Sequence, residues 1–294
     1  MPSAETNGTV LEYASDGPLD GPVMLLIAGL GNQLTSWSPD FVQQLTFAGF
    51  RVIRMDHRDT GLSTHFDDAP VPVLAAVTRS VALGLDPEIP YTLSDMANDV
   101  IAVMDAVGAA TFHVVGVSLG GMITQVLLTE HTSRVASATI IMARSGDSNF
   151  PSSDSGVALL TEPVPDPKFE REAFIEHEIA KRRALGSPAY PTCDNDLRQA
   201  VAAALDRAYN PDGNARQLAA SRAAPDFRGR LRTIDVPILI IHGKDDLLVP
   251  WQNGQDLAET LVRAWFLRIN GMGHNLPEQL TNLFVANIIS NCRR

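Results

Sequence analysis

Short apolar runs alternate along this chain with stretches of helical periodicity, and this alternation limits the possible folds more than any other feature. Strands buried on both faces are expected at 23–28, 50–55, 111–115, 135–143, 236–241 and 264–269. Helical patterns lie between or after them, at about 39–48, 92–107, 122–130, 251–262 and 278–290. Such alternation predicts an α/β fold, with a mostly parallel central sheet flanked by helices on both faces.

The alternation stops after residue 143 and returns near 236. Between them lie a stretch rich in Ser, Asp and Gly, three closely spaced prolines, and three helical segments at about 168–185, 194–208 and 213–223. We interpret 144–232 as a helical cap inserted between two parts of one core, 1–143 and 233–294. Because ligands bind beyond the carboxyl ends of the strands in such sheets, the cap is expected to govern substrate choice.

Composition restricts the partners of the chain. Its 294 residues are 45% hydrophobic, and 23 basic against 34 acidic residues give a net charge of −11, which argues against binding nucleic acid. The longest nearly apolar run, 23–30, is too short to span a membrane. No secretory signal is visible at 1–22, and the two cysteines, Cys193 and Cys292, form no CxxC pair. We therefore expect reduced thiols and a cytoplasmic location.

A Gly-x-Ser-x-Gly pattern at 116–120 stands where the strand at 111–115 gives way to a helix. At such a turn the residues two before and two after the serine must be small, and the serine hydroxyl is pushed out above the sheet. A glycine-rich turn of another α/β protein is the alternative, although no Gly-Lys-Ser or Gly-Lys-Thr sequence of a phosphate-binding loop is present. The pattern predicts Ser118 as a nucleophile.

A nucleophilic serine needs a base, and the base needs a third group to fix its tautomer. Asp245 and Asp246 follow the strand at 236–241, and His274 follows the strand at 264–269. These loops share one edge of the sheet with the serine, in the order Ser, Asp, His that accompanies this type of turn. We expect His274 to be the base and one of the two aspartates to be the acid.

Other residues compete for these roles. His57 follows the strand at 50–55 and neighbours Asp56, but it precedes the serine, which is the wrong order. Asp147, after the strand at 135–143, is an outside candidate for the acid.

These motifs resemble those of the α/β-hydrolase superfamily, and the resemblance extends over essentially the whole chain. The loop at 56–64 is similar to the corresponding loop of aclacinomycin methylesterase-like hydrolases, and 271–274 matches their closing Gly-x-Gly-His. In that family the acid stands four residues before the proline of its loop. Asp246 stands four before Pro250, so the resemblance implies Asp246 rather than Asp245.

The loop after the first core strand departs from the wider superfamily. Many members carry His-Gly there, whereas this chain has Ala28 and Gly29, and the aclacinomycin-type group also lacks the histidine. The donors to an oxyanion at this place are backbone N–H groups, which the resemblance assigns to Leu30 and Leu119. The remaining polar side chains of the 56–64 loop are expected to brace it: Asp56, Arg58 and Ser63.

The expected chemistry is hydrolysis of a small-molecule carboxylic ester through an acyl-enzyme. The resemblance implies a methyl ester of a bulky acid. Relatives with the same triad act as perhydrolases, lactonases or carbon–carbon bond hydrolases, and a non-catalytic binding protein is the alternative from another class. Neither a metal cluster nor a dinucleotide fingerprint occurs in the sequence, so no cofactor is expected, and the sequence does not indicate an oligomeric state.

Overall fold

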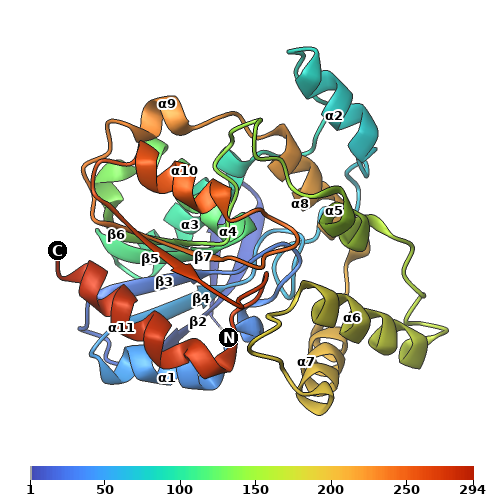
Figure 1. Cartoon of the computed structure of the whole chain (residues 1–294), viewed down its shortest axis with the longest axis horizontal. Helices are drawn as coiled ribbons and strands as arrows, with labels where there is room; N and C mark the ends of the chain where they lie inside the picture. Colours follow the sequence, from blue (N-terminus) through green and yellow to red (C-terminus); the bar gives the residue numbers. More distant parts are fainter. Residues whose placement is uncertain (1) are drawn as a thin grey trace.

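An eight-stranded sheet forms the centre of the molecule, in the order β1-β2-β4-β3-β5-β6-β7-β8 (Figure 1). The computed structural model describes residues 2–294, so residue 1 of the predicted core lies outside it. From β4 to β8 every neighbouring pair is parallel, as the sequence predicts. The strands are β1 (Ser3–Thr6), β2 (Thr9–Asp16), β3 (Val23–Ile27), β4 (Arg51–Met55), β5 (Phe112–Val117), β6 (Val135–Ile141), β7 (Ile238–Gly243) and β8 (Ala264–Ile269).

The edge formed by β1 and β2 is antiparallel and was not anticipated from the sequence. A two-residue turn of Asn7 and Gly8, both with positive φ, joins the two strands. Asn-Gly is a strong hairpin signal because both turn residues need positive φ. The hairpin could therefore have been predicted from Asn7 and Gly8, although this stretch lacks a long apolar run.

Helices cover both faces of the sheet (Figure 1). Helices α1 and α11 lie together on one face, and α3, α4 and α10 lie on the other. A separate apolar cluster fills the space on each side, so the sheet is buried on both faces. The helices outside the insertion are α1 (Pro39–Phe47), α2 (Leu74–Ala82), α3 (Leu93–Ala106), α4 (Leu119–Glu130), α10 (Gln252–Thr260) and α11 (Thr281–Cys292), with short 3-10 turns η1 (Leu34–Ser36), η2 (Thr132–Arg134) and η3 (Glu278–Leu280).

The segment between β6 and β7 is helical and extends to one side of the sheet (Figure 1). It contains α5 (Asp154–Thr161), α6 (Arg171–Leu185), α7 (Asp194–Arg207), α8 (Pro211–Ala223) and α9 (Arg228–Leu231); α5 and α9 were not anticipated. A small apolar cluster centred on Phe174, Ile175, Ile179 and Val201 joins α6 to α7. We refer to α5–α9 as the inserted segment.

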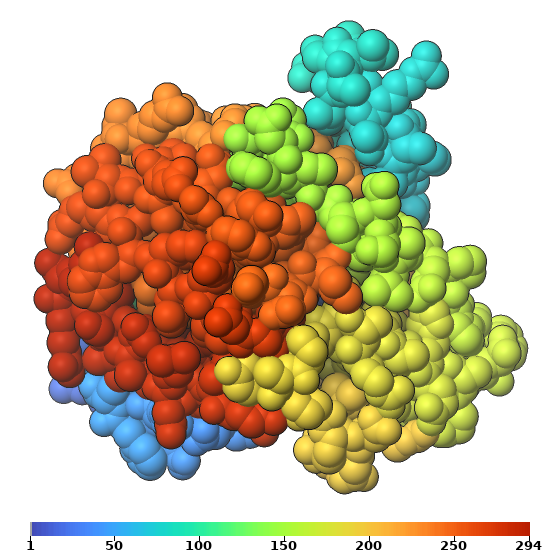
Figure 2. Space-filling model, in the orientation of Figure 1, coloured from blue at the N-terminus to red at the C-terminus, as the bar shows by residue number. Residues whose placement is uncertain are grey.

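Helix α2, also not anticipated, packs against α8, and the chain around it stands clear of the body (Figure 2). No helix within residues 2–294 is long and apolar enough to cross a membrane.

Candidate active site

Ser118 lies on a strained turn between β5 and α4. Its backbone has φ 53° and ψ −112°, a conformation that L-residues rarely adopt. A Cβ on Gly116 would lie 2.3 Å from the Gly120 carbonyl oxygen, and one on Gly120 would lie 2.2 Å from the Ile27 carbonyl oxygen. Both positions therefore require glycine, which is the physical content of the Gly-x-Ser-x-Gly pattern.

Three side chains from separate loops form one hydrogen-bonded chain at the carboxyl edge of the sheet. The Oγ of Ser118 lies 3.0 Å from Nε2 of His274, and Nδ1 of His274 lies 2.7 Å from Oδ2 of Asp246. This geometry fits an imidazole that donates from Nδ1 to the carboxylate and accepts the serine proton at Nε2. The structure thus brings together the three residues selected from the sequence.

The Asp246 carboxylate is held as an anion. Its Oδ1 accepts the N–H groups of Leu248 at 2.9 Å and Val249 at 2.8 Å. Burial alone would raise the pKa of Asp246, but the neighbouring His274 and His242 outweigh burial and hold this pKa below its ordinary range. Asp246 can therefore stabilise an imidazolium at neutral pH.

A second histidine, His242, lies beside the Asp246 carboxylate, a contact that was not anticipated from the sequence. Its ring is fully buried, with Nε2 2.9 Å from the Val249 carbonyl oxygen and 3.5 Å from Oδ2 of Asp246. A Cβ on Gly254 would lie 2.7 Å from the ring, so a glycine on α10 makes room for it. His242 directly follows the apolar run at 236–241, within β7, and this position could have signalled that it is buried.

The competing residues lie elsewhere. Asp245 accepts the Gly271 N–H at 2.7 Å and so braces the histidine loop. His57 is buried, with Nε2 3.1 Å from the Ala28 carbonyl oxygen, and burial lowers its pKa. Asp147 pairs with Arg228 rather than with a histidine.

The loop after β3 lies beside the serine. A Cβ on Gly29 would lie 3.5 Å from the Ser118 Cβ, which places the backbone near Leu30 next to the nucleophile. Leu119 is the first residue of α4, so its N–H points out of the helix N-terminus at the same place. This arrangement can offer N–H groups to a developing oxyanion.

Helix α8 of the inserted segment contacts the loop after β3. The buried Gln217 of α8 accepts the Gly31 N–H at 3.1 Å and donates to the Arg58 carbonyl oxygen at 2.8 Å. Gly31 has φ 65°, and a Cβ there would lie 2.5 Å from Oδ1 of Asn214, so helix and loop are in close contact.

A second contact joins α7 to the same loop. Gln33 donates from Nε2 to the carbonyl oxygens of Ala204 and Ala208, at 2.8 and 3.0 Å, and accepts from Arg207 at 2.7 Å. Arg207 also pairs with Asp56 at 2.7 Å. These partners are more than a hundred residues apart in the chain and carry no local motif, so sequence reasoning missed them.

The 56–64 loop is braced as expected. Asp56 accepts the N–H groups of Leu34 at 2.7 Å and Leu62 at 3.0 Å, and Ser63 donates to the Asp56 carbonyl oxygen at 2.8 Å. Arg58 forms a two-pronged pair with Asp99, at 2.6 and 2.7 Å. These interactions fix the 56–64 loop, and with it the Arg58 carbonyl oxygen that accepts from Gln217.

The histidine loop also contacts the inserted segment. The His274 N–H donates to the Leu185 carbonyl oxygen at 2.7 Å, and the Gly273 N–H donates to Ser187 Oγ at 2.9 Å. Among residues 2–294, no group of three or more His, Cys, Asp or Glu side chains could hold a metal ion.

Comparison with known proteins agrees with the fold. The model of the α/β hydrolase fold family matches residues 22–279, so the chain belongs to this family. Rhodomycin D methylesterase DauP of Streptomyces sp. (strain C5) is 29% identical, over 94% of this chain and 92% of its own length. RutD of Variovorax paradoxus (strain S110), to which carbamate hydrolysis is attributed, is 31% identical over 91% of each chain. Family and relatives support a hydrolase and the resemblance to aclacinomycin methylesterase-like enzymes.

A solved structure extends the likeness to the whole fold. The meta-cleavage product hydrolase CumD of Pseudomonas fluorescens IP01 superposes with a TM-score of 0.77, covering 100% of this chain and 97% of its own. Its identity to this chain is 18%, so it shows the fold alone.

Proposed function

We propose that this chain is a serine hydrolase that cleaves carboxylic esters through an acyl-enzyme. The observation that carries the proposal is the unbroken chain from Ser118 Oγ through His274 to the ionised Asp246, on a turn that exposes the hydroxyl. A methyl ester of a bulky acid is the proposed substrate, by similarity to the rhodomycin D methylesterases.

In this mechanism Ser118 Oγ attacks the ester carbonyl carbon while its proton passes to Nε2 of His274. The N–H groups of Leu30 and Leu119 hold the carbonyl oxygen as it becomes negative. The proton then passes from His274 to the alcohol oxygen as the carbon–oxygen bond breaks. Water, deprotonated by His274, releases the acid and restores the serine.

We also propose that the inserted segment acts as a cap over this site, because α6, α7 and α8 contact the loops around it. The division at 1–143, 144–232 and 233–294 and the cytoplasmic location stay predictions.

Covalent labelling tests the nucleophile directly. A fluorophosphonate probe should label the wild-type protein and not Ser118→Ala, in which p-nitrophenyl acetate turnover should fall to background with an unchanged circular dichroism spectrum. Ser290→Ala, at an exposed position of α11, is the matched control and should label normally. An unlabelled wild-type protein would indicate the binding-protein alternative, and labelled Ser118→Ala would remove Ser118 as nucleophile.

A substrate screen then separates reactions that share the triad. Esters should be turned over faster than a matched carbamate, a lactone or a diketo acid. Faster carbamate hydrolysis would align this chain with the activity attributed to RutD instead.

A further inference from the structure

Arg144 stands at the same edge of the sheet as the nucleophile. It follows β6, whose last residue, Ile141, accepts the Ser118 N–H at 2.9 Å. The Arg144 carbonyl oxygen accepts from Nε2 of Gln125 at 2.8 Å, and Gln125 belongs to α4, the helix that begins at the serine. Between them, a Cβ on Gly121 would lie 2.6 Å from the Ala143 Cβ. The backbone of Arg144 is therefore fixed against the elements that position Ser118.

The Arg144 side chain is half-buried and has no anion beside it. Its Nε is buried without a hydrogen-bond partner, and within residues 2–294 its side chain forms no ion pair. Burial lowers its pKa, and the neighbouring cation of Arg222 lowers it further. Arg222 lies in the last turn of α8 and also lacks an ion-pair partner within the part of the chain that the structure describes. The charges of these two arginines therefore act on each other, one from the end of β6 and one from the last turn of α8.

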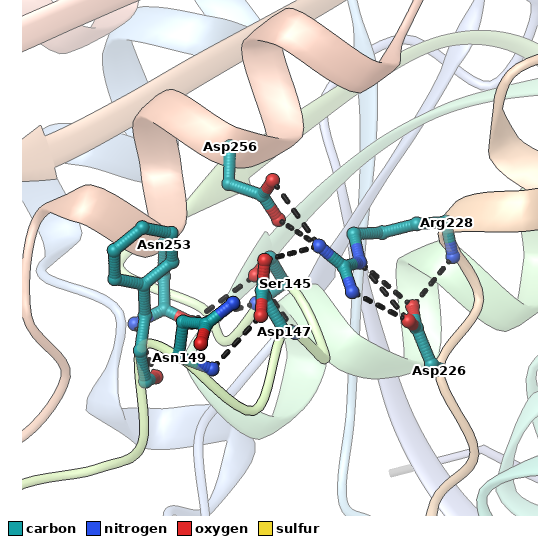
Figure 3. Close-up of polar contacts among 8 residues, drawn as sticks. Ser145, Asp147, Asn149, Asp226, Arg228, Asn253 and Asp256 are labelled. Carbon is teal, nitrogen blue, oxygen red and sulfur yellow. Dashed lines mark hydrogen bonds and ion pairs between the residues drawn. The ribbon is translucent and has the colours of Figure 1, made fainter.

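Three carboxylates gather around a different arginine, Arg228 (Figure 3). Arg228 binds Asp226 at 2.7 Å, Asp256 at 3.4 Å, and Asp147. Asp147 stands only three residues after Arg144, yet the fold directs it to an arginine that already has two carboxylates. Arg144 is therefore left without a counter-charge although its own loop contains a carboxylate, that of Asp147.

A half-buried guanidinium without a protein partner is unfavourable, and such charged groups are candidates for ligand binding. A guanidinium presents a planar set of donors that matches a carboxylate in two-pronged geometry. An anionic part of the substrate would supply the missing counter-charge.

We propose that Arg144, assisted by Arg222, binds a free carboxylate of the substrate, so that the preferred substrates are esters that carry a second, ionised carboxyl group. Monoesters of dicarboxylic acids are the simplest members of this class. The inference rests on the proposed ester hydrolysis at Ser118 and names its substrate class.

Matched esters test the proposal. The kcat/KM values of monomethyl esters of C4 to C8 dicarboxylic acids would be compared with methyl esters of monocarboxylic acids of equal length. For the best chain length, the wild-type protein should favour the anionic ester by at least about tenfold, as expected for a charge-assisted hydrogen bond. Arg144→Gln should lose about 10- to 100-fold on that ester and stay within about twofold on the neutral one. Arg222→Gln should lose less, and Arg293→Gln, an exposed control with the same charge change, should match wild type.

Thermal unfolding separates this role from a structural one. Removing a half-buried charge that has no protein partner should leave the melting temperature of Arg144→Met unchanged or raise it, because no native ion pair is lost. A lower melting temperature together with equal losses on both esters would show that Arg144 serves the fold, and would overturn the proposal.

A binding measurement tests the carboxylate site separately from ester hydrolysis. Monomethyl glutarate would be titrated calorimetrically into Ser118→Ala, which needs no turnover. Binding that is lost in Ser118→Ala/Arg144→Gln supports the carboxylate site even if wild type hydrolyses no ester. Turnover of neutral esters without a preference for anionic ones, and without this binding, would overturn the subsite and leave the proposed ester hydrolysis standing.

Discussion

At the scale of single residues, the adjacent aspartates of the acid loop are held in different directions. Asp246 accepts two backbone N–H groups and faces His274, whereas Asp245 turns to the Gly271 N–H. Of these two adjacent residues, Asp246 therefore contacts the imidazole, and Asp245 braces the neighbouring histidine loop. Neither side chain can replace the other without moving the backbone.

This difference predicts unequal losses on mutation. Asp246→Asn should lower kcat by roughly 10⁴, as when the corresponding acid of a serine protease is changed, because the amide favours the wrong imidazole tautomer. Asp245→Asn keeps the shape and should lose less than about tenfold, because its acceptor oxygen is retained. Steady-state kinetics on one ester measures both. Equal losses, or a larger loss for Asp245→Asn, would mean that the acid is misassigned.

These residues could be selected from the sequence because each is marked locally. Ser118 is bracketed by glycines, and the acid and base loops each follow an apolar strand. Choosing Asp246 over Asp245 needed the spacing to Pro250 from the resemblance, since composition gives no direction to a side chain. The support from His242 depends on packing against α10, which no local pattern encodes.

At the scale of elements, the inserted segment forms hydrogen bonds with the loops around Ser118 and His274. The sequence indicated its helices because their periodicity is local, although α5, in a stretch rich in Ser, Asp and Gly, was missed. It did not indicate that α8 reaches the loop after β3, because Gln217 and Gly31 are 186 residues apart. We therefore expect the segment to affect the chemical step as well as substrate choice.

Bulky apolar side chains of the segment are poor markers of the substrate. Phe174, a bulky apolar residue of α6, packs inside the segment against Tyr209 with ring centroids 5.1 Å apart. Phe169 is 85% exposed. Substitution of Phe174 would therefore loosen the α6–α7 pair before it reshaped a binding surface.

Gln217 offers a sharper test of the coupling. Gln217→Leu keeps the size of the side chain but removes the acceptor for the Gly31 N–H and the donors to Arg58 and Thr60. The loop that carries Leu30 should lose its fixed position, and kcat should fall by about tenfold or more, in line with partial loss of an oxyanion donor.

The fall should be similar on the smallest and the largest esters, with KM changed little. Gln43→Leu, on the exposed side of α1, is the control and should leave kcat unchanged. Loss confined to large esters would show that α8 shapes the substrate site without holding the loop.

At the scale of the whole molecule, buried ion pairs tie the inserted segment to the core. Arg216 of α8 meets Asp59 at 2.8 Å with both side chains almost fully buried, and Arg207 of α7 meets Asp56. Asp59 has φ 67°, a strained value for a non-glycine residue, which these contacts maintain. The two parts of the molecule are therefore joined by charge as well as by apolar packing.

The pair between Asp59 and Arg216 makes stability depend on pH in a defined direction. Burial alone would raise the pKa of Asp59, but hydrogen bonds from Arg216, the Phe66 N–H and Tyr91 outweigh it and hold this pKa below the ordinary 3.8. Below about pH 3.8 the unfolded chain therefore takes up a proton at this site before the folded protein does. The stabilisation by ionised Asp59 is complete above that pH and is lost as the pH falls through the lower, folded-state pKa.

Asp59→Asn should consequently lower the free energy of unfolding near pH 7 by about 3–5 kcal/mol, because Arg216 keeps its burial and loses its anion. The gap between wild type and variant should stay constant from pH 7 to about pH 5 and narrow below about pH 3.8, as wild-type Asp59 becomes protonated. Urea unfolding of both proteins at a series of pH values measures this difference in the free energy of unfolding. Asp105→Asn, which removes an exposed pair with Arg134, should shift stability by less than about 1 kcal/mol at every pH. A gap that widened in acid would mean that Asp59 is protonated in the folded protein, and that α8 is held by neutral hydrogen bonds instead of an ion pair.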